Sequence, residues 1–148
     1  QGFDPTRVRV LQSLDLAGTP TKRPWAVPVT WVRQIGHGRL FYTNLGHTPA
    51  TWSDPRFRDQ IVQAVQWAGG AGRPDADPNP VDQAVDAIAA LLAWSGDDPA
   101  IAQRLTDQRP AWLLDMGRRI TALIDHEGDH DALVAAVAPL RREVLAQL

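Results

Sequence analysis

The 148-residue chain is long enough for one domain or two small ones, because the fraction of surface that folding buries rises with chain length. Its formal net charge of −2 supplies no broad basic field for neutralising phosphates, so we expect no nucleic acid as a partner. The chain has no cysteine, which excludes disulfides and thiolate ligands. No apolar run approaches the roughly 20 residues that span a bilayer, so we expect a soluble protein without a membrane partner. We assign it to the cytoplasm, although the absence of cysteine says little about the compartment.

Three strands are the first elements that the sequence predicts. Residues 7–11 alternate charged and apolar side chains, which is typical of a strand, and they lead into a loop near Asp15. Two further strand-like runs, 27–34 and 39–44, flank the turn Gly36-His37-Gly38. Because glycine tolerates the positive φ angles of a tight turn, we expect these two runs to form a β-hairpin.

A helix is predicted after the loop 45–49. Ser53 or Asp54 can cap its first turn, and Pro55 suits the first helical position. Gly69-Gly70 is expected to end it. The apolar residues that recur at helical spacing, and that we expect to be buried, are Phe57, Ile61, Ala64, Val65 and Ala68.

Residues 71–80 form a proline-rich segment that cannot continue a helix, so we predict an exposed linker between domains 1–70 and 81–148. Beyond the linker the strand pattern is lost and the apolar residues keep a helical period. Four helices are predicted, from Pro80 to Gly96, from Asp98 to Thr106, from Pro110 to about His126, and from Asp129 to the end. Such helices with short loops favour a small bundle.

A set of spaced residues in the first domain carries a family resemblance. They are Pro28-Val29-Thr30-Trp31, Gly36-His37-Gly38-Arg39, Tyr42, Leu45-Gly46-His47, Asp54-Pro55, Phe57 and Trp67-Ala68. In this order and spacing, the segment from about residue 7 to 70 resembles the closing section of ThuA-like (trehalose utilisation) domains. One departure is His37, which stands where the family usually has lysine. The resemblance implies that the larger N-terminal part of such a domain is missing from this chain.

The resemblance also implies a fold and a ligand class. The fold is α/β: the C-terminal portion of a doubly wound, class I glutamine amidotransferase-like or flavodoxin-like sandwich, followed by an all-helical region. In open sheets of this kind, ligands bind beyond the carboxyl ends of strands. The implied ligand is a small-molecule sugar, either trehalose or a related glycoside or keto-sugar. Because exposed sheet edges favour association, we expect a partner chain that supplies the missing part, a homo-oligomer, or an edge covered by the C-terminal helices.

Candidate site residues cluster after the second strand of the hairpin. His47 follows a strand and a glycine, in a loop where the resemblance implies a site residue, and an imidazole can move protons during sugar chemistry. Asn44 and Tyr42 stand beside it at the strand end, where they can bind sugar hydroxyls. Trp52 offers an aromatic face that can stack on a sugar ring. Each residue also has a structural interpretation, as part of a loop that satisfies its own backbone.

Two residues are weaker candidates for ligand binding. Arg39 could hold an anionic group, although a hairpin arginine more often packs or stays solvated. Asp15 could face the same crevice as His47, yet a turn-forming aspartate is the commoner explanation. The segment 126–130 matches the HExxH zinc-protease pattern, but Gly128 inside it predicts a helix end between the two histidines. We therefore predict no metal ion and no cofactor.

Three functions are compatible with these patterns. The first is a ThuA-like protein of carbohydrate metabolism in which His47 acts as acid and base. The second is a non-catalytic module that binds carbohydrate or another protein. The third is one subunit of a split enzyme, whose remaining site residues lie on a different chain. Whether the chain is an enzyme is left open by the sequence.

Overall fold

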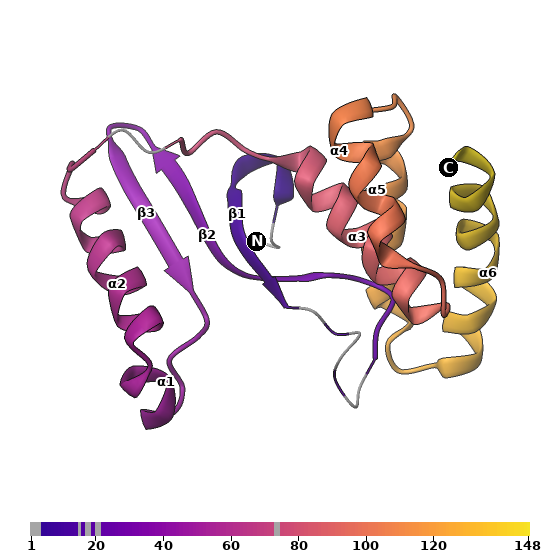
Figure 1. Cartoon of the computed structure of the whole chain (residues 1–148), viewed down its shortest axis with the longest axis horizontal. Coiled ribbons are helices and arrows are strands. Elements are labelled where there is room, and N and C mark those ends of the chain that lie inside the picture. The colour runs from indigo at the N-terminus through magenta and orange to yellow at the C-terminus, as the bar shows by residue number, and fades with distance from the viewer. Residues whose placement is uncertain (1–3, 15, 17–18, 20–21, 73–74) are drawn as a thin grey trace. The chain divides into compact units, whose positions relative to one another are not determined.

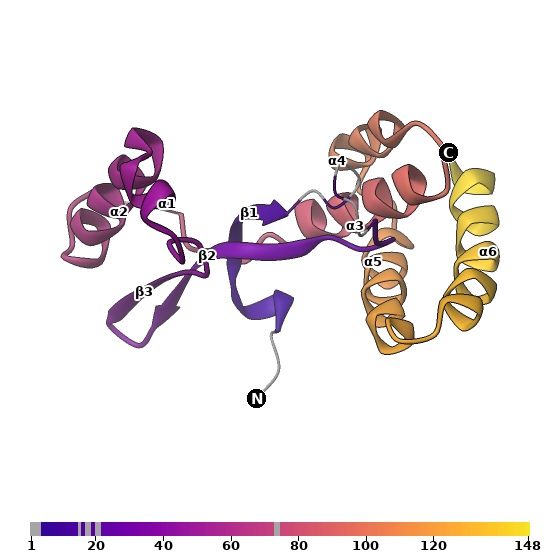
Figure 2. The same cartoon turned by 90° about the horizontal axis from the view of Figure 1, so that it is seen from below.

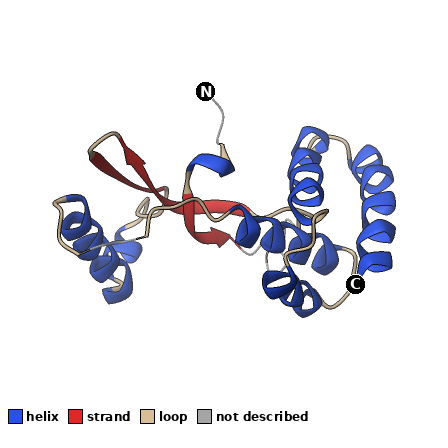
Figure 3. Cartoon of the chain, turned by 90° about the horizontal axis from the view of Figure 1, so that it is seen from above, coloured by secondary structure: helices blue, strands red, loops and turns tan. Residues whose placement is uncertain are grey.

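The computed structural model describes residues 4–14, 16, 19, 22–72 and 75–148 (Figure 1). The chain divides into two compact units, one from residues 1–13 and 28–79 and the other from residues 14–27 and 80–148. The first unit contains strands and helices, and the second is helical (Figure 3). The protein is therefore mixed α/β.

A three-stranded sheet in the order β1-β2-β3 forms the centre of the first unit. Its strands are β1 (Arg9–Leu14), β2 (Val27–Ile35) and β3 (Gly38–Thr43). β1 starts two residues later than predicted, because Asp4 caps the short 3₁₀ helix η1 (Pro5–Arg7) by accepting from the Thr6 amide at 3.0 Å.

The predicted hairpin between β2 and β3 is confirmed. The two strands are antiparallel, with pairs that run from Ile35–Gly38 at the turn to Thr30–Thr43 at the far end. Gly36 has a φ of +57° in the turn, a backbone conformation that residues with a Cβ atom rarely adopt. The two-residue turn therefore fixes the register, and a slip by one residue would move every side chain to the opposite face.

Two helices follow the hairpin. α1 (Pro49–Ser53) is capped by Thr48, and α2 (Pro55–Ala68) is capped by Asp54, one of the two residues predicted for that position. α2 ends where predicted, with Gly70 at a φ of +97°. It packs beside β3 (Figure 1).

The buried stripe of α2 differs from the predicted one. Phe57, Ala64 and Trp67 are buried, whereas Val65 is 67% exposed and Ala68 is exposed too. Successive residues on a helix point about 100° apart, so a helix that packs mainly beside one strand buries a narrow stripe. Val65, one residue after the buried Ala64, lies outside that stripe.

The proline-rich segment after α2 is exposed at Asp75 and Asp77, and it is also attached to β1. Arg9 forms an ion pair with Asp75 at 2.6 Å. The Asn79 side chain accepts from the Val10 amide at 2.8 Å and donates to the Val10 carbonyl at 2.9 Å. Asn79 thus satisfies both backbone groups of Val10, as a neighbouring strand would.

The second unit is built around α3. Its elements are α3 (Pro80–Trp94), η2 (Pro99–Gln103), α4 (Arg104–Gln108), α5 (Leu113–Thr121), η3 (Ala122–His126) and α6 (His130–Gln147). α3 contacts η2, α4, α5 and α6 (Figure 2). The two middle helices predicted from the sequence are each split, into η2 with α4 and into α5 with η3. None of the helices in the described part of the chain has the length and apolarity that a bilayer crossing needs.

The core of the helical unit is apolar and closely packed. Ile88, Leu91 and Leu92 of α3 are fully buried. Trp25, from the segment before β2, is only 3% exposed and joins this core. α5 lies so near α3 that a Cβ atom on Gly117 would be 2.6 Å from the Ala84 Cβ atom, which explains a glycine in the middle of a helix.

Ion pairs hold α6 against the other helices. Arg141 binds both carboxylate oxygens of Asp97, at 2.6 and 2.7 Å, and Arg119 binds Glu143 in the same way at 2.8 and 2.7 Å. The Arg141 guanidinium holds the pKa of the Asp97 carboxyl below its usual range by hydrogen bonding. These pairs join segments that are far apart in sequence.

The HExxH-like segment lies across a helix boundary, as predicted. His126 ends η3, and His130 begins α6 with Asp129 as its cap. The Asp129 carboxylate accepts from the Ala132 amide at 3.0 Å. The two histidines are therefore not on one continuous helix, which a zinc-protease motif requires.

Candidate functional site

The loop of residues 44–48 connects β3 to α1, and its backbone is hydrogen-bonded to the sheet. The Asn44 amide donates to the Val29 carbonyl at 3.0 Å. The next amide, that of Leu45, donates to the Thr43 hydroxyl at 3.2 Å. The loop is thus fixed where it leaves the strand.

An aromatic pair fixes the middle of the same loop. The Trp52 indole N–H donates to the Gly46 carbonyl at 2.8 Å, and its ring meets Phe57 edge to face at 5.0 Å between centroids. Gly46 has a φ of +104°, and a Cβ atom there would lie 3.2 Å from the Phe57 ring. Both the backbone angle and the close aromatic contact therefore require glycine at this position.

His47 lies at the end of this fixed loop, and its side chain is exposed. The next residue, Thr48, caps α1 and accepts from the Thr51 amide at 3.4 Å. His47 therefore stands between two anchored positions, Gly46 and Thr48, with its imidazole open to solvent.

Asp54, the nearest carboxylate along the chain, is committed to structure. It caps α2 and accepts hydrogen bonds from the Arg56 amide at 2.9 Å and the Arg56 guanidinium at 2.7 Å. These bonds from Arg56 lower the pKa of Asp54 to about 2. Asp54 is therefore ionised at neutral pH and is a poor candidate for a proton donor beside His47.

A polar network that the sequence analysis missed lies under the loop. Thr30 of β2 is fully buried, and its hydroxyl donates to the Gln12 side-chain carbonyl at 2.7 Å. The Thr30 and Thr43 hydroxyls are 3.0 Å apart. The side-chain NH₂ group of Gln60, on α2, donates to the same Gln12 oxygen at 2.9 Å. The only sequence signal was a threonine within the apolar run of β2.

Tyr42 lies on the other face of the sheet. Neighbouring residues of a strand point to opposite faces, so Tyr42 points away from the Thr30–Thr43 side. Its ring stacks on Trp31, its partner across the hairpin, at 4.8 Å between centroids and 18° between planes. Tyr42 is 43% exposed and lies two residues before Asn44 in sequence.

Arg39 is directed to the C-terminus of α2 instead of the loop. Its guanidinium donates to the Trp67 carbonyl at 2.7 Å and lies 5.5 Å from the centroid of the Trp67 ring. Asn44 is five residues further along the chain, which corresponds to about 16 Å in a strand. Arg39 therefore lies apart from Asn44, whereas Trp52 is bonded to the loop that carries Asn44 and His47.

Asp15, the remaining candidate, lies outside the described residues. Across the described ranges, which omit residues 1–3, 15, 17–18, 20–21 and 73–74, no group of three or more histidines, aspartates or glutamates is arranged to hold a metal ion.

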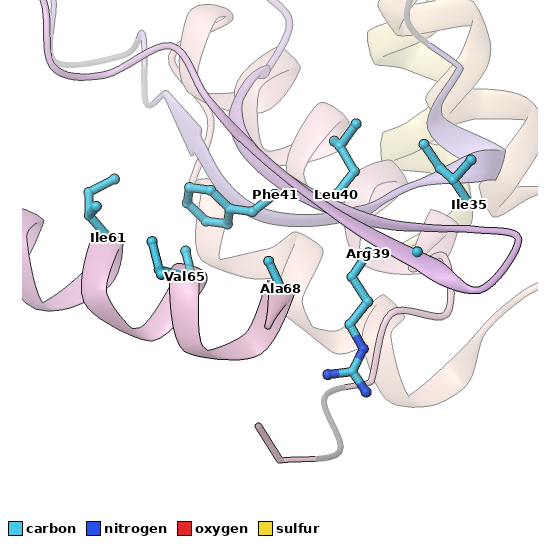
Figure 4. Close-up of a pocket in the computed structure, with 9 residues that line it drawn as sticks. Ile35, Arg39, Leu40, Phe41, Ile61, Val65 and Ala68 are labelled. Carbon is cyan, nitrogen blue, oxygen red and sulfur yellow. The ribbon is translucent and has the colours of Figure 1, made fainter. Parts of the chain in front are cut away.

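An apolar groove lies between the hairpin and α2 (Figure 4), with a volume of about 560 Å³. Phe41 points toward α2, while Leu40 and Ile35 point away from it. Ile35 is 48% exposed and Val65 is 67% exposed. The groove is lined by Ile35, Gly38, Arg39, Leu40, Phe41, Ile61, Ala64, Val65 and Ala68.

Comparison with known families identifies the N-terminal part of the chain, which contains most of the first unit. Residues 2–68 match the family model described as ThuA, trehalose utilisation. This segment is a member of the ThuA family. The match ends at Ala68, which is also the last residue of α2, so it stops before the C-terminal part of the helical unit, residues 80–148. It includes residues 14–27, which belong to the helical unit. It indicates a role related to trehalose utilisation. No curated protein and no solved structure matches the chain.

Arg39→Met tests whether Arg39 is structural. We expect the free energy of unfolding of the ThuA segment to fall by about 1–2 kcal/mol, because the Trp67 carbonyl loses a charged donor at a helix C-terminus. Urea unfolding followed by circular dichroism measures this change. Arg58→Met, which removes the same charge from an exposed site on α2, is the control and is expected to be near neutral. A shift of the His47 imidazole NMR signals in Arg39→Met alone would contradict this interpretation.

Proposed function

We propose that the ThuA segment binds trehalose, or a related glycoside or keto-sugar, at the loop of residues 44–48. In this proposal His47 is the acid and base, Asn44 and Tyr42 orient sugar hydroxyls, and Trp52 supplies an aromatic contact. The single observation that carries it is a loop with an anchored backbone and an exposed imidazole at its end. An anchored loop holds a reacting group in place before the substrate arrives.

The side chains around His47 suit a sugar better than an ion. Asn44 is exposed and can both donate to and accept from hydroxyl groups. Trp52 is 51% exposed even though its N–H is engaged by Gly46, so part of its ring is available to the apolar face of a sugar. An imidazole can both donate and accept a proton, as chemistry at a keto-sugar or a glycosidic linkage requires.

Membership of the ThuA family also supports a larger architecture. We infer that the segment is the closing portion of a doubly wound, glutamine amidotransferase-like sandwich. In such sheets the ligand lies beyond strand ends, and the loop of His47 follows the last residue of β3, Thr43. The remaining strands of that sandwich would then be supplied by another chain or another part of the protein.

His47→Ala tests the proposed role of the imidazole. We expect trehalose binding, measured by isothermal titration calorimetry, to persist while turnover of trehalose or its oxidised derivative falls by about 10²–10⁴-fold, because the proton-transfer group is lost. His37→Ala removes another exposed histidine, in the hairpin turn, and is the matched control.

Three outcomes of that experiment separate the alternatives. Lost turnover with an unchanged circular dichroism spectrum supports acid–base catalysis by His47. A change in affinity without any measurable turnover in the unaltered protein supports a non-catalytic sugar-binding module. If His47→Ala and His37→Ala behave alike in binding and turnover, the assignment of His47 is wrong.

A second function is favoured by the apolar groove between the hairpin and α2: the segment could be one subunit of a split enzyme. Ile35 and Val65 line the groove and expose large apolar side chains, at 48% and 67%. Contiguous exposed apolar surface marks sites of association. On this proposal, the occupant is a second chain that carries further strands of a ThuA domain.

Val65→Glu tests the split-enzyme proposal. We expect the native protein to co-purify with a second chain, and we expect this variant to lose it, because a carboxylate would be buried without a partner. Native mass spectrometry measures both states. Val134→Glu, at a 43% exposed position of the helical unit, is the control. A mass that is a multiple of the chain would indicate a homo-oligomer instead, and a monomeric mass would contradict both forms of association.

A further inference from the structure

Four side chains from four elements form one hydrogen-bonded series beneath the loop of His47. They are Gln12 of β1, Thr30 of β2, Thr43 of β3 and Gln60 of α2. The series ends on the loop itself, since the Leu45 amide donates to the Thr43 hydroxyl at 3.2 Å. Each strand of the sheet and the covering helix therefore contribute to one support.

The direction of these hydrogen bonds follows from counting hydrogens. The Thr30 hydroxyl has one hydrogen, which it donates to the Gln12 oxygen at 2.7 Å. In its 3.0 Å contact with Thr43, Thr30 must consequently accept, so Thr43 donates. Thr43 in turn accepts from Leu45. The order is Leu45 amide, Thr43 hydroxyl, Thr30 hydroxyl and Gln12 carbonyl, with each group donating to the next.

The Gln12 carbonyl is the common acceptor at the end of the series. It accepts from Thr30 and, at 2.9 Å, from the Gln60 amide. These two hydrogen bonds connect the Gln12 side chain of β1 to both β2 and α2. The three bonds that run from the Leu45 amide to the Gln12 oxygen point the same way, so they polarise and strengthen one another.

Packing alone does not account for the central hydroxyl. Thr30 is fully buried, and valine has nearly the same shape and occurs close by at Val29 and Val32. Burying a hydroxyl is unfavourable unless it is hydrogen-bonded, so its gain has to lie in the bonds that it makes. Those bonds lead to the loop on one side and to α2 on the other.

We propose that Thr30, Gln12 and Gln60 are positioning residues that act through Thr43 on the loop of Asn44 and His47. This inference rests on the proposed function only in giving His47 a role, since the support itself is defined by the loop geometry. The Thr30 hydroxyl sets the direction of the Thr43 hydroxyl, which then presents a lone pair to the Leu45 amide. The loop leaves β3 in one fixed conformation as a result.

The experiment compares Thr30→Val with Thr30→Ser in the whole chain. The valine variant removes the hydroxyl at nearly constant volume, while the serine variant keeps it. Thr121→Val is the matched control, because it removes a hydroxyl that donates to the Gly117 carbonyl at 2.9 Å in the helical unit. NMR measures amide hydrogen exchange at Leu45 and the imidazole signals of His47. Calorimetry with trehalose as the probe measures binding.

In Thr30→Val we expect the amide hydrogen exchange rate of Leu45 to rise by about tenfold, which corresponds to the loss of roughly one net hydrogen bond. We also expect the His47 imidazole signals to shift. Thr30→Ser is expected to restore both, and Thr121→Val to change neither. If Thr30 only stabilised the fold, Thr30→Val would lower the free energy of unfolding without moving the His47 signals. If Leu45 and His47 are unchanged in a folded Thr30→Val protein, the proposal is wrong.

A second variant covers the case in which Thr30→Val fails to fold. Thr43→Val, at a half-buried position, then makes the same test, and unaltered His47 signals in it would overturn the proposal. Two further results distinguish a failure of this proposal from a failure of the proposed function. If the unaltered protein does not bind trehalose while Leu45 and His47 respond to Thr30→Val, the sugar assignment fails and the positioning role stands. If trehalose binds and Thr30→Val leaves the Leu45 and His47 signals unchanged, the positioning role fails and the sugar assignment stands.

Discussion

The pairing of β2 with β3 is the constraint on which the rest of the ThuA segment depends. A two-residue turn with Gly36 at positive φ sets the register, and that register places Thr30 directly opposite Thr43. The same register puts Arg39 on the α2 side, where it reaches the Trp67 carbonyl, and Tyr42 on the other side against Trp31. A slip by one residue would exchange these faces and separate the two threonines.

Much of this arrangement could be predicted from local sequence. The hairpin, the Asp54 cap, the glycines that end α2 and the break between His126 and His130 each depend on a few adjacent residues with strong backbone preferences. Membership of the ThuA family was also visible from spaced residues in this segment, and the family match over residues 2–68 confirms it.

Other features needed the folded chain. The network of Gln12, Thr30, Thr43 and Gln60 joins residues up to 48 positions apart in sequence, and each of them alone is an ordinary polar residue. Helical periodicity marked Val65 as buried, but a helix that covers one strand leaves it 67% exposed. Trp25 could not be assigned because its burial depends on helices that follow it by more than 50 residues.

The ThuA segment and the helical unit differ in what their structures indicate about function. The ThuA segment combines a family assignment, an anchored loop and an apolar groove, and each of these bears on function. The helical unit has a close-packed apolar core and ion pairs at its surface. Its side chains explain packing and do not point to a chemistry.

The central claim is that this protein binds a sugar at the loop after β3. The most direct measurement is a ¹H–¹⁵N NMR titration of the whole chain with trehalose, because it reports on every backbone amide at once. The account predicts that the largest shifts fall on residues 44–52, with smaller ones at Thr30 and Thr43. Shifts confined to the helical unit, or to the groove residues Ile35 and Val65, would contradict it.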